Sequence, residues 1–360
     1  MRAFLAWLAL TCSCAAAQNS AASALQSQAE EARTKGDPAA IKLYQRALTA
    51  TPDWKEGWWA LGSLEYGKDH FPECREAFRK LTELAPRAGG AFGMLGLCEV
   101  GAKDYVNALE HLRAGKEFGF GSDALEKTGR YHLARLYTKS GDFESALRVI
   151  AELGENTQES AAFVRLAGIA ALWKPLFPEE VPAADQELVY LAGKAFWHAF
   201  ARNAATAETE LSELAERYPR EKGVHYLFGS FELRNNPDKA VTEFETELKI
   251  DPTHSGALSA LAAEYLRRKD PEKGIPYARE LGKVMPASPV PHTLLGRLLA
   301  ESGENKEAVA ELEKARDMSP DDPQPRITLA SVYAKLGRSA DAARERAAFT
   351  KLNAARDKDK

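Results

Sequence analysis

Histidine is the residue of this sequence best suited to metal binding or acid–base catalysis, and three histidines occupy similar places. His225 and His292 fall at the large inward position of a helical pattern, and His198 falls at another inward position. Imidazoles that met across neighbouring helices could bind zinc or transfer a proton. No carboxylate or thiolate shares their spacing, so a ligand set is incomplete. We therefore expect hydrogen-bonded histidines inside the fold, with no metal site and no cofactor.

Other candidates for catalysis are weaker. Glu179 and Glu180 are adjacent in a proline-rich stretch, which fixes no distance between the two carboxylates. His132 lies near Tyr131 and Arg135, but no nucleophile stands beside a base and an orienting group. The sequence also lacks the glycine-rich phosphate motifs and the zinc-protease motif. We expect a protein that is not an enzyme, and an enzyme with an unrecognised site is the alternative.

The elements that carry these residues are amphipathic helical hairpins. Within residues 286–320, apolar residues recur at intervals of three and four, with Leu295 and Leu299 in one helix and Ala308 and Leu312 in the next. A Gly-Glu-Asn turn separates the two helices, and a proline ends the second. One such hairpin is too small to bury its apolar face alone, so it needs a neighbour.

The same unit recurs with a period near 34 residues. The prolines that end successive units are 33, 34 and 34 residues apart: Pro219, Pro252, Pro286 and Pro320. A small residue of the first helix keeps the same spacing, because Gly62 and Gly96 are 34 residues apart. A fixed period of this length predicts a stack of hairpins in which each covers the apolar face of the next.

At these positions the sequence resembles the tetratricopeptide-repeat family. Trp58-x2-Leu61-Gly62, followed by Cys74-x3-Phe78 and Pro86, matches the family's pattern. The resemblance implies an all-α, right-handed superhelical solenoid of about nine full hairpins and one half repeat. It is specific for the fold, whereas function has to be argued from a site.

The expected organisation follows the repeats. We expect a cleaved signal peptide at 1–17, four hairpins at 21–160, a half repeat at 161–187, five hairpins at 188–353 with the last as a cap, and a charged tail at 354–360. In the half repeat three prolines forbid a second regular helix. Leu176, Phe177 and Val181 would cover the unmatched apolar face there, and they form a second candidate binding surface.

The first residues predict export. Arg2 precedes an apolar run that is too short to span a bilayer, and Ala15-Ala16-Ala17 gives a cleavage site before Gln18. This pattern is typical of a secretory signal, so we expect a periplasmic or secreted protein. Cys12 and Cys14 leave open a lipid-anchored, outer-membrane form, although the residues before them fit a lipidation motif poorly.

Two cysteines, Cys74 and Cys98, remain after cleavage. We expect two small buried side chains, because free cysteine is commonly buried. A disulfide between neighbouring hairpins is the alternative that an oxidising compartment allows.

The resemblance also implies where a partner would bind. In the family, first helices line a concave groove that holds peptides or partner helices. Carried over to this sequence, the expected groove residues are Trp59, Tyr66, Met94, Leu97, Tyr131, His132, Arg135, Lys139, Phe196, Phe200, Tyr226, Arg234, Arg267, Arg297 and Lys335. Aromatic residues and arginine dominate binding hot spots, so these side chains would bury apolar groups and orient acidic ones. The cationic members near helix ends are also explained by the helix dipole alone.

The charge composition limits the class of partner that we expect. With 48 Lys and Arg against 52 Asp and Glu, the formal net charge is −4, which is unlike a general nucleic-acid binder. We expect an exported scaffold that binds a protein or peptide partner, with contact to a membrane only through a lipid anchor. A glycan- or peptidoglycan-binding envelope protein and a lipid-tethered assembly factor are the alternatives. The oligomeric state is not predicted.

Overall fold

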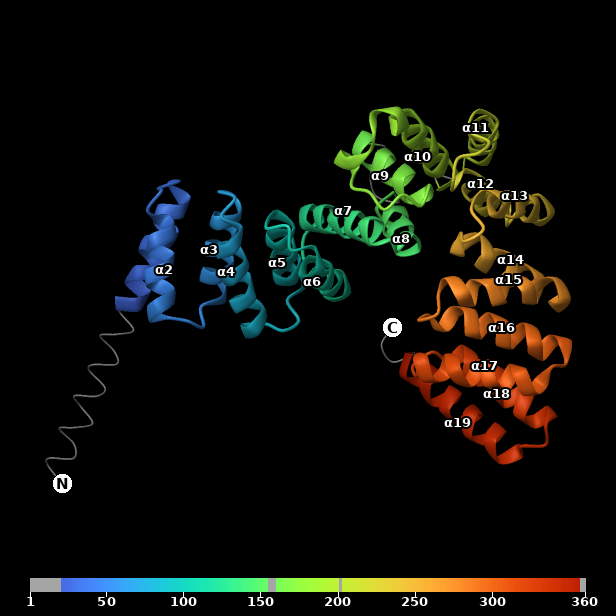
Figure 1. The fold of residues 1–360 in the computed structure, drawn as a ribbon. Helices are drawn as coiled ribbons and strands as arrows, with labels where there is room; N and C mark the ends of the chain where they lie inside the picture. The colour runs from blue at the N-terminus through green and yellow to red at the C-terminus, as the bar shows by residue number, and fades with distance from the viewer. Residues whose placement is uncertain (1–20, 155–159, 201–202, 357–360) are drawn as a thin grey trace, which may run out of the picture. The chain divides into compact units, whose positions relative to one another are not determined.

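The computed structural model describes residues 21–154, 160–200 and 203–356, and the secondary structure of these residues is entirely helical. The predicted all-α repeat architecture is confirmed (Figure 1). After a helix that includes residues 21–34, the elements are α2 (Ala40–Ala50), α3 (Lys55–Tyr66), α4 (Phe71–Leu84), α5 (Gly89–Gly101), α6 (Tyr105–Phe118), α7 (Asp123–Ser140), α8 (Phe143–Gly154), α9 (Ala161–Ala171), α10 (Gln186–Phe200), α11 (Ala204–Arg217), α12 (Val224–Glu232), α13 (Pro237–Ile250), α14 (Ser255–Arg267), α15 (Pro271–Val284), α16 (Pro289–Ser302), α17 (Asn305–Met318), α18 (Pro323–Lys335) and α19 (Ser339–Arg356).

The chain forms two compact units by its contacts. Residues up to Ala170 and the segment Lys174–Val181 make up the first unit, and Ala171–Trp173 with Pro182 onward make up the second. In both units consecutive helices pack in pairs, such as α3 on α4 and α16 on α17. First helices of neighbouring pairs also touch, as α5 and α7 do in the first unit and α14 and α16 in the second.

Small residues set the crossing of the two helices within a hairpin. A Cβ added at Gly62 would lie 2.6 Å from Phe78, and one added at Gly296 would lie 2.5 Å from Leu312. These glycines therefore let a large side chain of the second helix approach the backbone of the first. The periodic small residue of the sequence has this physical role in the fold.

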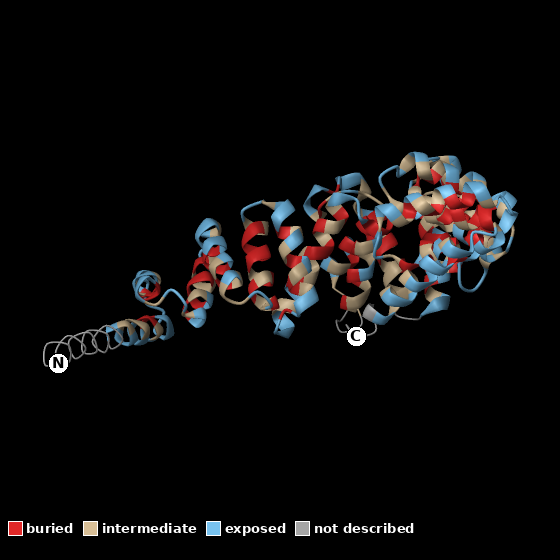
Figure 2. Ribbon diagram, turned by 90° about the horizontal axis from the view of Figure 1, so that it is seen from below, coloured by how far each residue is buried: buried red, intermediate tan, exposed pale blue. Residues whose placement is uncertain are grey.

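Apolar residues are buried in successive hairpins instead of in one nucleus (Figure 2). Phe120, in the connection between α6 and α7, is 1% exposed and replaces the proline that ends other units. It lies against three glycines from α5, α6 and α7, namely Gly93, Gly115 and Gly129. A loop residue thus supplies part of the packing between neighbouring hairpins.

The half repeat has one regular helix. After α9 the chain passes through Trp173, which has a positive φ of 53°, and then contains two short 3-10 turns, Pro178–Glu180 and Ala183–Asp185. Proline lacks the amide hydrogen that a helix interior needs, which explains why no second α-helix forms here. We call the segment Lys174–Val181, which belongs to the first unit, the strap.

Cys74 of α4 and Cys98 of α5 form a disulfide, with their Cα atoms 5.9 Å apart. The expectation of two unlinked thiols is therefore wrong, and the structure has the alternative, a disulfide between neighbouring hairpins. The two side chains belong to one buried cluster with Phe78 and Leu95, which brings the sulfur atoms together. The disulfide joins the second hairpin of the chain to the third.

Several sequence predictions fall outside the described residues. These are the signal peptide at 1–17, the possible lipidation of Cys12 or Cys14, and the last four residues of the tail. Among the helices that the structure describes, none has the length and apolar character needed to cross a membrane.

Candidate functional site

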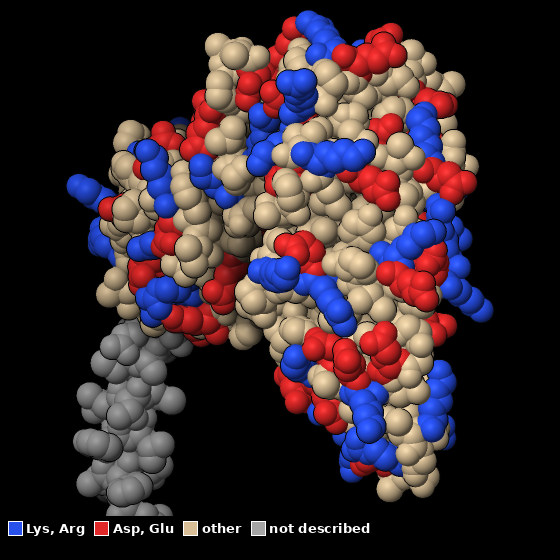
Figure 3. All heavy atoms as spheres, turned by 45° about the vertical axis from the view of Figure 1, so that its right-hand side comes forward, with Lys and Arg blue, Asp and Glu red and all other residues tan. Residues whose placement is uncertain are grey.

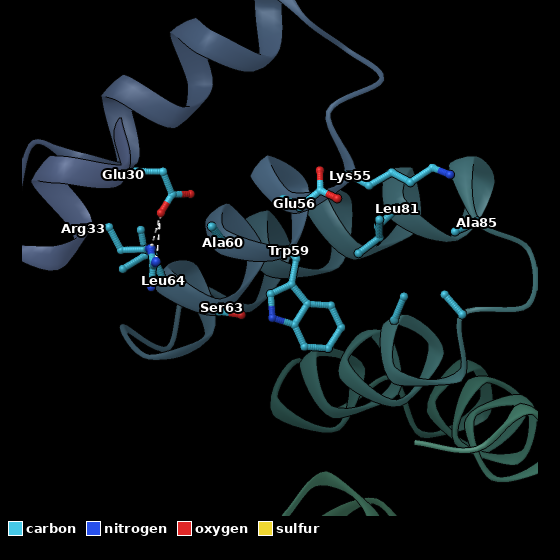
Figure 4. A pocket seen from close by; sticks show the side chains of 12 residues that line it. Glu30, Arg33, Lys55, Glu56, Trp59, Ala60, Ser63, Leu64, Leu81 and Ala85 are labelled. Atoms are coloured by element: carbon cyan, nitrogen blue, oxygen red, sulfur yellow. Dashed lines mark hydrogen bonds and ion pairs between the residues drawn. The ribbon is translucent and has the colours of Figure 1, made fainter. Parts of the chain in front are cut away.

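A hollow of about 630 Å³ lies beside Trp59 in the first unit. Its walls come from the helix at 21–34, from α3, and from the end of α4 with the start of α5. Trp59 is 40% exposed, and Figure 4 shows its indole ring projecting from α3 between Ser63 and the end of α4. We call this the Trp59 hollow.

The walls of the Trp59 hollow are mainly apolar, and charged side chains line it at two places, Glu30 with Arg33 and Lys55 with Glu56. Ala60, Leu64, Leu81 and Ala85 line it. At the rim the Arg33 guanidinium donates to the Glu30 carboxylate over 2.8 Å. Trp59 is itself held by an edge-to-face contact with Phe78, at 5.4 Å between ring centroids. A fixed, half-exposed indole over an apolar floor is suited to bury an apolar side chain of a partner.

The other residues predicted for the N-terminal groove are less available. Tyr66 and Met94 pack against the buried cluster around the disulfide, and Leu97 is 4% exposed. Tyr66 also meets Phe71 edge to face, at 6.1 Å between ring centroids. These side chains stabilise the contact between hairpins, and Trp59 lines the hollow without them.

The strap lies on the two cations predicted for the middle of the groove. Arg135 donates to the Glu179 carboxylate over 2.6 Å, and Lys139 donates to the Glu180 carboxylate over 2.7 Å. The ring of Phe177 lies 5.0 Å from the Arg135 guanidinium and 5.3 Å from the Lys139 ammonium. Glu179 and Glu180, which the sequence presented only as a poor catalytic pair, are thus ligands of a cationic helix face.

Phe177 and Val181 are buried, at 5% and 6% exposed, and Leu176 is half-buried. The prediction that Leu176, Phe177 and Val181 form a second binding surface is therefore wrong for the two buried residues. Phe177 meets Tyr105 at 5.0 Å between ring centroids, which explains its burial. The three residues do cover apolar surface, as expected, but they do not offer it to a partner.

His132 is half-buried beside the same cations. Burial first, and then the charge of Arg135, lowers the pKa of His132 to about 4. Its Nδ1 lies 3.3 Å from a guanidinium nitrogen of Arg135. Tyr131 packs on Phe163 at 5.5 Å between ring centroids and lies under the Arg135 guanidinium. A neutral histidine at this place adds no positive charge to the α7 face.

In the second unit the predicted aromatic residues are half-buried. Tyr226 packs with Trp173 and His254, at 5.2 Å and 4.6 Å between ring centroids. Burial lowers the pKa of His254 to about 4, so this cluster is uncharged at neutral pH. Phe196 and Phe200 lie on α10 and are also half-buried. The structure brings Tyr226 into an aromatic cluster and not into an open groove.

The predicted cations of the second unit have different surroundings. Arg267 binds Glu264 of its own helix through two hydrogen bonds, of 2.7 Å and 2.6 Å, and the Lys335 ammonium lies 3.5 Å from the carbonyl oxygen of Ala300. Arg234 is exposed and Arg297 is half-buried. On the face that Figure 3 draws, Lys and Arg alternate with Asp and Glu, so that face has no continuous basic surface.

The inward histidines are hydrogen-bonded, as their pattern predicts. His198, His225 and His292 each bind a glutamate of the second helix of their own hairpin through Nδ1, at 2.6, 2.7 and 2.5 Å to Glu210, Glu243 and Glu311. The sequence pattern does not reveal these carboxylates, because the spacing from histidine to glutamate varies between hairpins. No three His, Cys, Asp or Glu side chains come together as a metal site within the described ranges.

Comparison with known proteins agrees with the repeat pattern. Models of the tetratricopeptide repeat match residues 59–121 of the first unit and residues 299–348 of the second. No protein of curated function matches the chain.

Solved structures of MamA are also similar. MamA 41-end from Desulfovibrio magneticus RS-1 is 21% identical over 48% of this chain and 97% of its own, with a TM-score of 0.44. A MamA RS-1 ArsTM double mutant is 19% identical over 48% and 97%, with a TM-score of 0.45.

Proposed function

Since this chain is a tetratricopeptide-repeat protein, a family of protein-interaction scaffolds, we propose that it binds a segment of a partner protein in the Trp59 hollow. The observation that carries the proposal is the half-exposed indole of Trp59, which lines a mainly apolar hollow of about 630 Å³. Tryptophan is one of the residue types enriched among the few side chains that dominate binding energy. The partner segment would place an apolar side chain there.

We also propose that the protein is exported. The disulfide between Cys74 and Cys98 supports an oxidising compartment, where such bonds persist. The charged start, apolar run and alanine-rich site of residues 1–17 support the same reading. Mass measurement of the mature N-terminus tests it, because cleavage before Gln18 gives a free chain and a lipid on Cys12 or Cys14 gives an anchored one.

The hollow is tested by site-specific crosslinking in cells. A photoreactive amino acid at Ser63, on the wall of the Trp59 hollow, should give a discrete crosslinked species whose partner is identified by mass spectrometry. The same amino acid at Val106, which is 81% exposed and outside the hollow, is the matched control. Identical products from both positions would contradict the proposal.

Trp59→Ala supplies the quantitative prediction. Removal of a central tryptophan should weaken binding of the identified partner segment by about 2 kcal/mol, which is roughly thirtyfold in Kd. The helical circular dichroism spectrum should stay unchanged, because Trp59 is half-exposed and meets the buried cluster through an edge-to-face contact with Phe78. An unchanged Kd for the variant would remove Trp59 from the binding site.

A further inference from the structure

The strap covers a surface that is formed by the end of α5, Tyr105 at the start of α6, and Arg135 and Lys139 of α7, which we call the α5–α7 surface. The contacts of the strap show which chemical groups this surface binds. Arg135 and Lys139 are four residues apart on α7, so their charges lie on one face of the helix. Two like charges at this spacing repel, and the carboxylates of Glu179 and Glu180 neutralise them. The aromatic ring of Phe177 contacts both cations and Tyr105. The occupied site therefore binds an aromatic group followed closely by two acidic groups.

The strap meets this surface as a peptide ligand would. It is an extended segment with a single turn at Pro178–Glu180, and it does not supply the second helix that other hairpins have. Two of its backbone hydrogen bonds lie within the strap itself, from the Glu180 amide to the Phe177 carbonyl and from the Leu176 amide to the Lys174 carbonyl. The Glu180 carboxylate also accepts from the Phe177 amide over 2.7 Å, which sets the spacing between ring and acid.

The polar part of this contact is open to water on the side of the strap, whereas the side chain of Arg135 is only 16% exposed. The side chains of Glu179 and Glu180 are 62% and 40% exposed, and that of Lys139 is 36% exposed. A hollow of about 180 Å³ remains between the strap, α7 and the end of α5, and Lys103, Tyr105 and His132 line it. Solvent-exposed ion pairs exchange partners readily, because water and salt compete with them.

We propose that the α5–α7 surface binds a partner peptide carrying an aromatic residue followed within three positions by two carboxylates, and that the strap occupies this surface until such a peptide displaces it. The charge complementarity of Arg135 and Lys139 selects an acidic peptide. The contact between Phe177 and Tyr105 selects an aromatic anchor. This inference goes beyond the proposed function, because it concerns a different surface and does not require the Trp59 hollow to bind anything.

The first test measures the fluorescence anisotropy of a labelled peptide with the strap sequence, residues 174–181, added to the mature protein. A variant with Phe177→Ala, Glu179→Gln and Glu180→Gln, which we call the opened variant, lacks the side chains that attach the strap. It should bind the peptide at least tenfold more tightly than the unaltered protein. Adding Arg135→Glu and Lys139→Glu to this variant should abolish binding. Lys127→Glu, at an exposed position of α7, is the control, and adding it to the same variant should leave binding unchanged.

Charge reversal in the peptide provides the specificity control. A peptide with two lysines in place of the two glutamates should not bind the opened variant, and it should bind once Arg135 and Lys139 are both glutamate. Equal binding of the acidic and the basic peptide would overturn the proposal, as would no binding by an opened variant with an unchanged circular dichroism spectrum.

A second measurement covers the case in which the opened variant does not fold. Hydrogen exchange of residues 174–181 in the unaltered protein should become faster when the acidic peptide is in excess, and it should not change with the basic peptide. Unchanged exchange with both peptides would overturn the proposal. Neither experiment contains a ligand of the Trp59 hollow, so failure here leaves the crosslinking test at Ser63 unaffected.

Discussion

Four imidazoles of this protein have shifted pKa values, and the shifts go in two opposite directions. The Glu243 carboxylate raises the pKa of His225, and the Glu99 carboxylate does the same for His111. Burial instead lowers the pKa of His132 and His254 to about 4. Protonation of a histidine paired with a carboxylate therefore stabilises the folded protein, whereas protonation of a buried histidine without such a partner is unfavourable. The pairs tie the two helices of a hairpin together in a pH-dependent way.

The pair of His225 and Glu243 gives a prediction with a definite sign. The pKa of His225 is raised above its ordinary value of 6.5, so the contribution of the pair is present below about pH 6.5 and is lost as the pH rises through the folded-state pKa. Glu243→Gln should therefore lower the free energy of unfolding by about 1 kcal/mol more at about pH 5.5 than at about pH 8.5. Urea titrations at the two pH values measure this difference.

Glu213→Gln is the control for that measurement, because Glu213 is exposed on α11 of the same unit. It should change stability by less than about 0.5 kcal/mol at either pH. A loss for Glu243→Gln that is equal at both pH values would show that the pair acts through neutral hydrogen bonding alone.

At the scale of residues, the sequence predicted types of environment better than partners. The inward histidines could be placed from the helical period alone, and Trp59 does line a hollow. The aromatic residues of the second unit were harder to assign. Tyr226 packs on Trp173 from the broken repeat, a residue 53 positions earlier, at 5.2 Å between ring centroids. No period connects those two positions, so this contact could not be found from the pattern.

The hairpin is the element that the sequence specified most fully, because its small crossing residue has a simple steric cause. Gly296 of α16 faces Leu312 of α17 so closely that a methyl group would lie 2.5 Å from Leu312 Cγ. Gly282 of α15 has ordinary space, with Pro291 Cβ at 3.8 Å from an added methyl group. Both glycines are helical and belong to the second unit, so they form a matched pair.

Alanine at these two positions should have opposite effects. Gly296→Ala should destabilise the second unit by about 1–3 kcal/mol, because the methyl group pushes two packed helices apart. Gly282→Ala should stabilise it by up to about 1 kcal/mol, because alanine favours the helix over glycine. Thermal unfolding followed by circular dichroism distinguishes the two. A stabilising Gly296→Ala would show that the crossing can relax, contrary to the packing described.

The strap is the element that the sequence specified least. Its prolines predict that no second helix forms, but they do not predict where the segment lies. Its position depends on contacts of Phe177 and Glu180 with Tyr105 and Lys139, which are distant in sequence. Burial of a phenylalanine contributes about 1.5–3 kcal/mol, and an exposed ion pair about 0–1 kcal/mol. The ring therefore provides most of the attachment, and the carboxylates provide selectivity.

At the scale of the whole chain, stability is distributed along two units, each built from contacts between neighbouring hairpins. In such arrays a local constraint stabilises the hairpins near it more than distant ones. The disulfide between Cys74 and Cys98 is a constraint of this kind and lies in the first unit. Loss of the disulfide should therefore lower the stability of the first unit more than that of the second.

The final prediction concerns this uneven response. Closing a loop of 24 residues restricts the unfolded chain, so removing the disulfide should destabilise the first unit by about 3 kcal/mol. Hydrogen exchange in mild denaturant should become faster in peptides from α3 to α8 when a reductant is added, and stay the same in peptides from α12 to α19. Cys74→Ala with Cys98→Ala should show the faster exchange without reductant and no further change with it, which separates loss of the bond from loss of packing. Faster exchange in both units together would mean that the chain unfolds as one cooperative body.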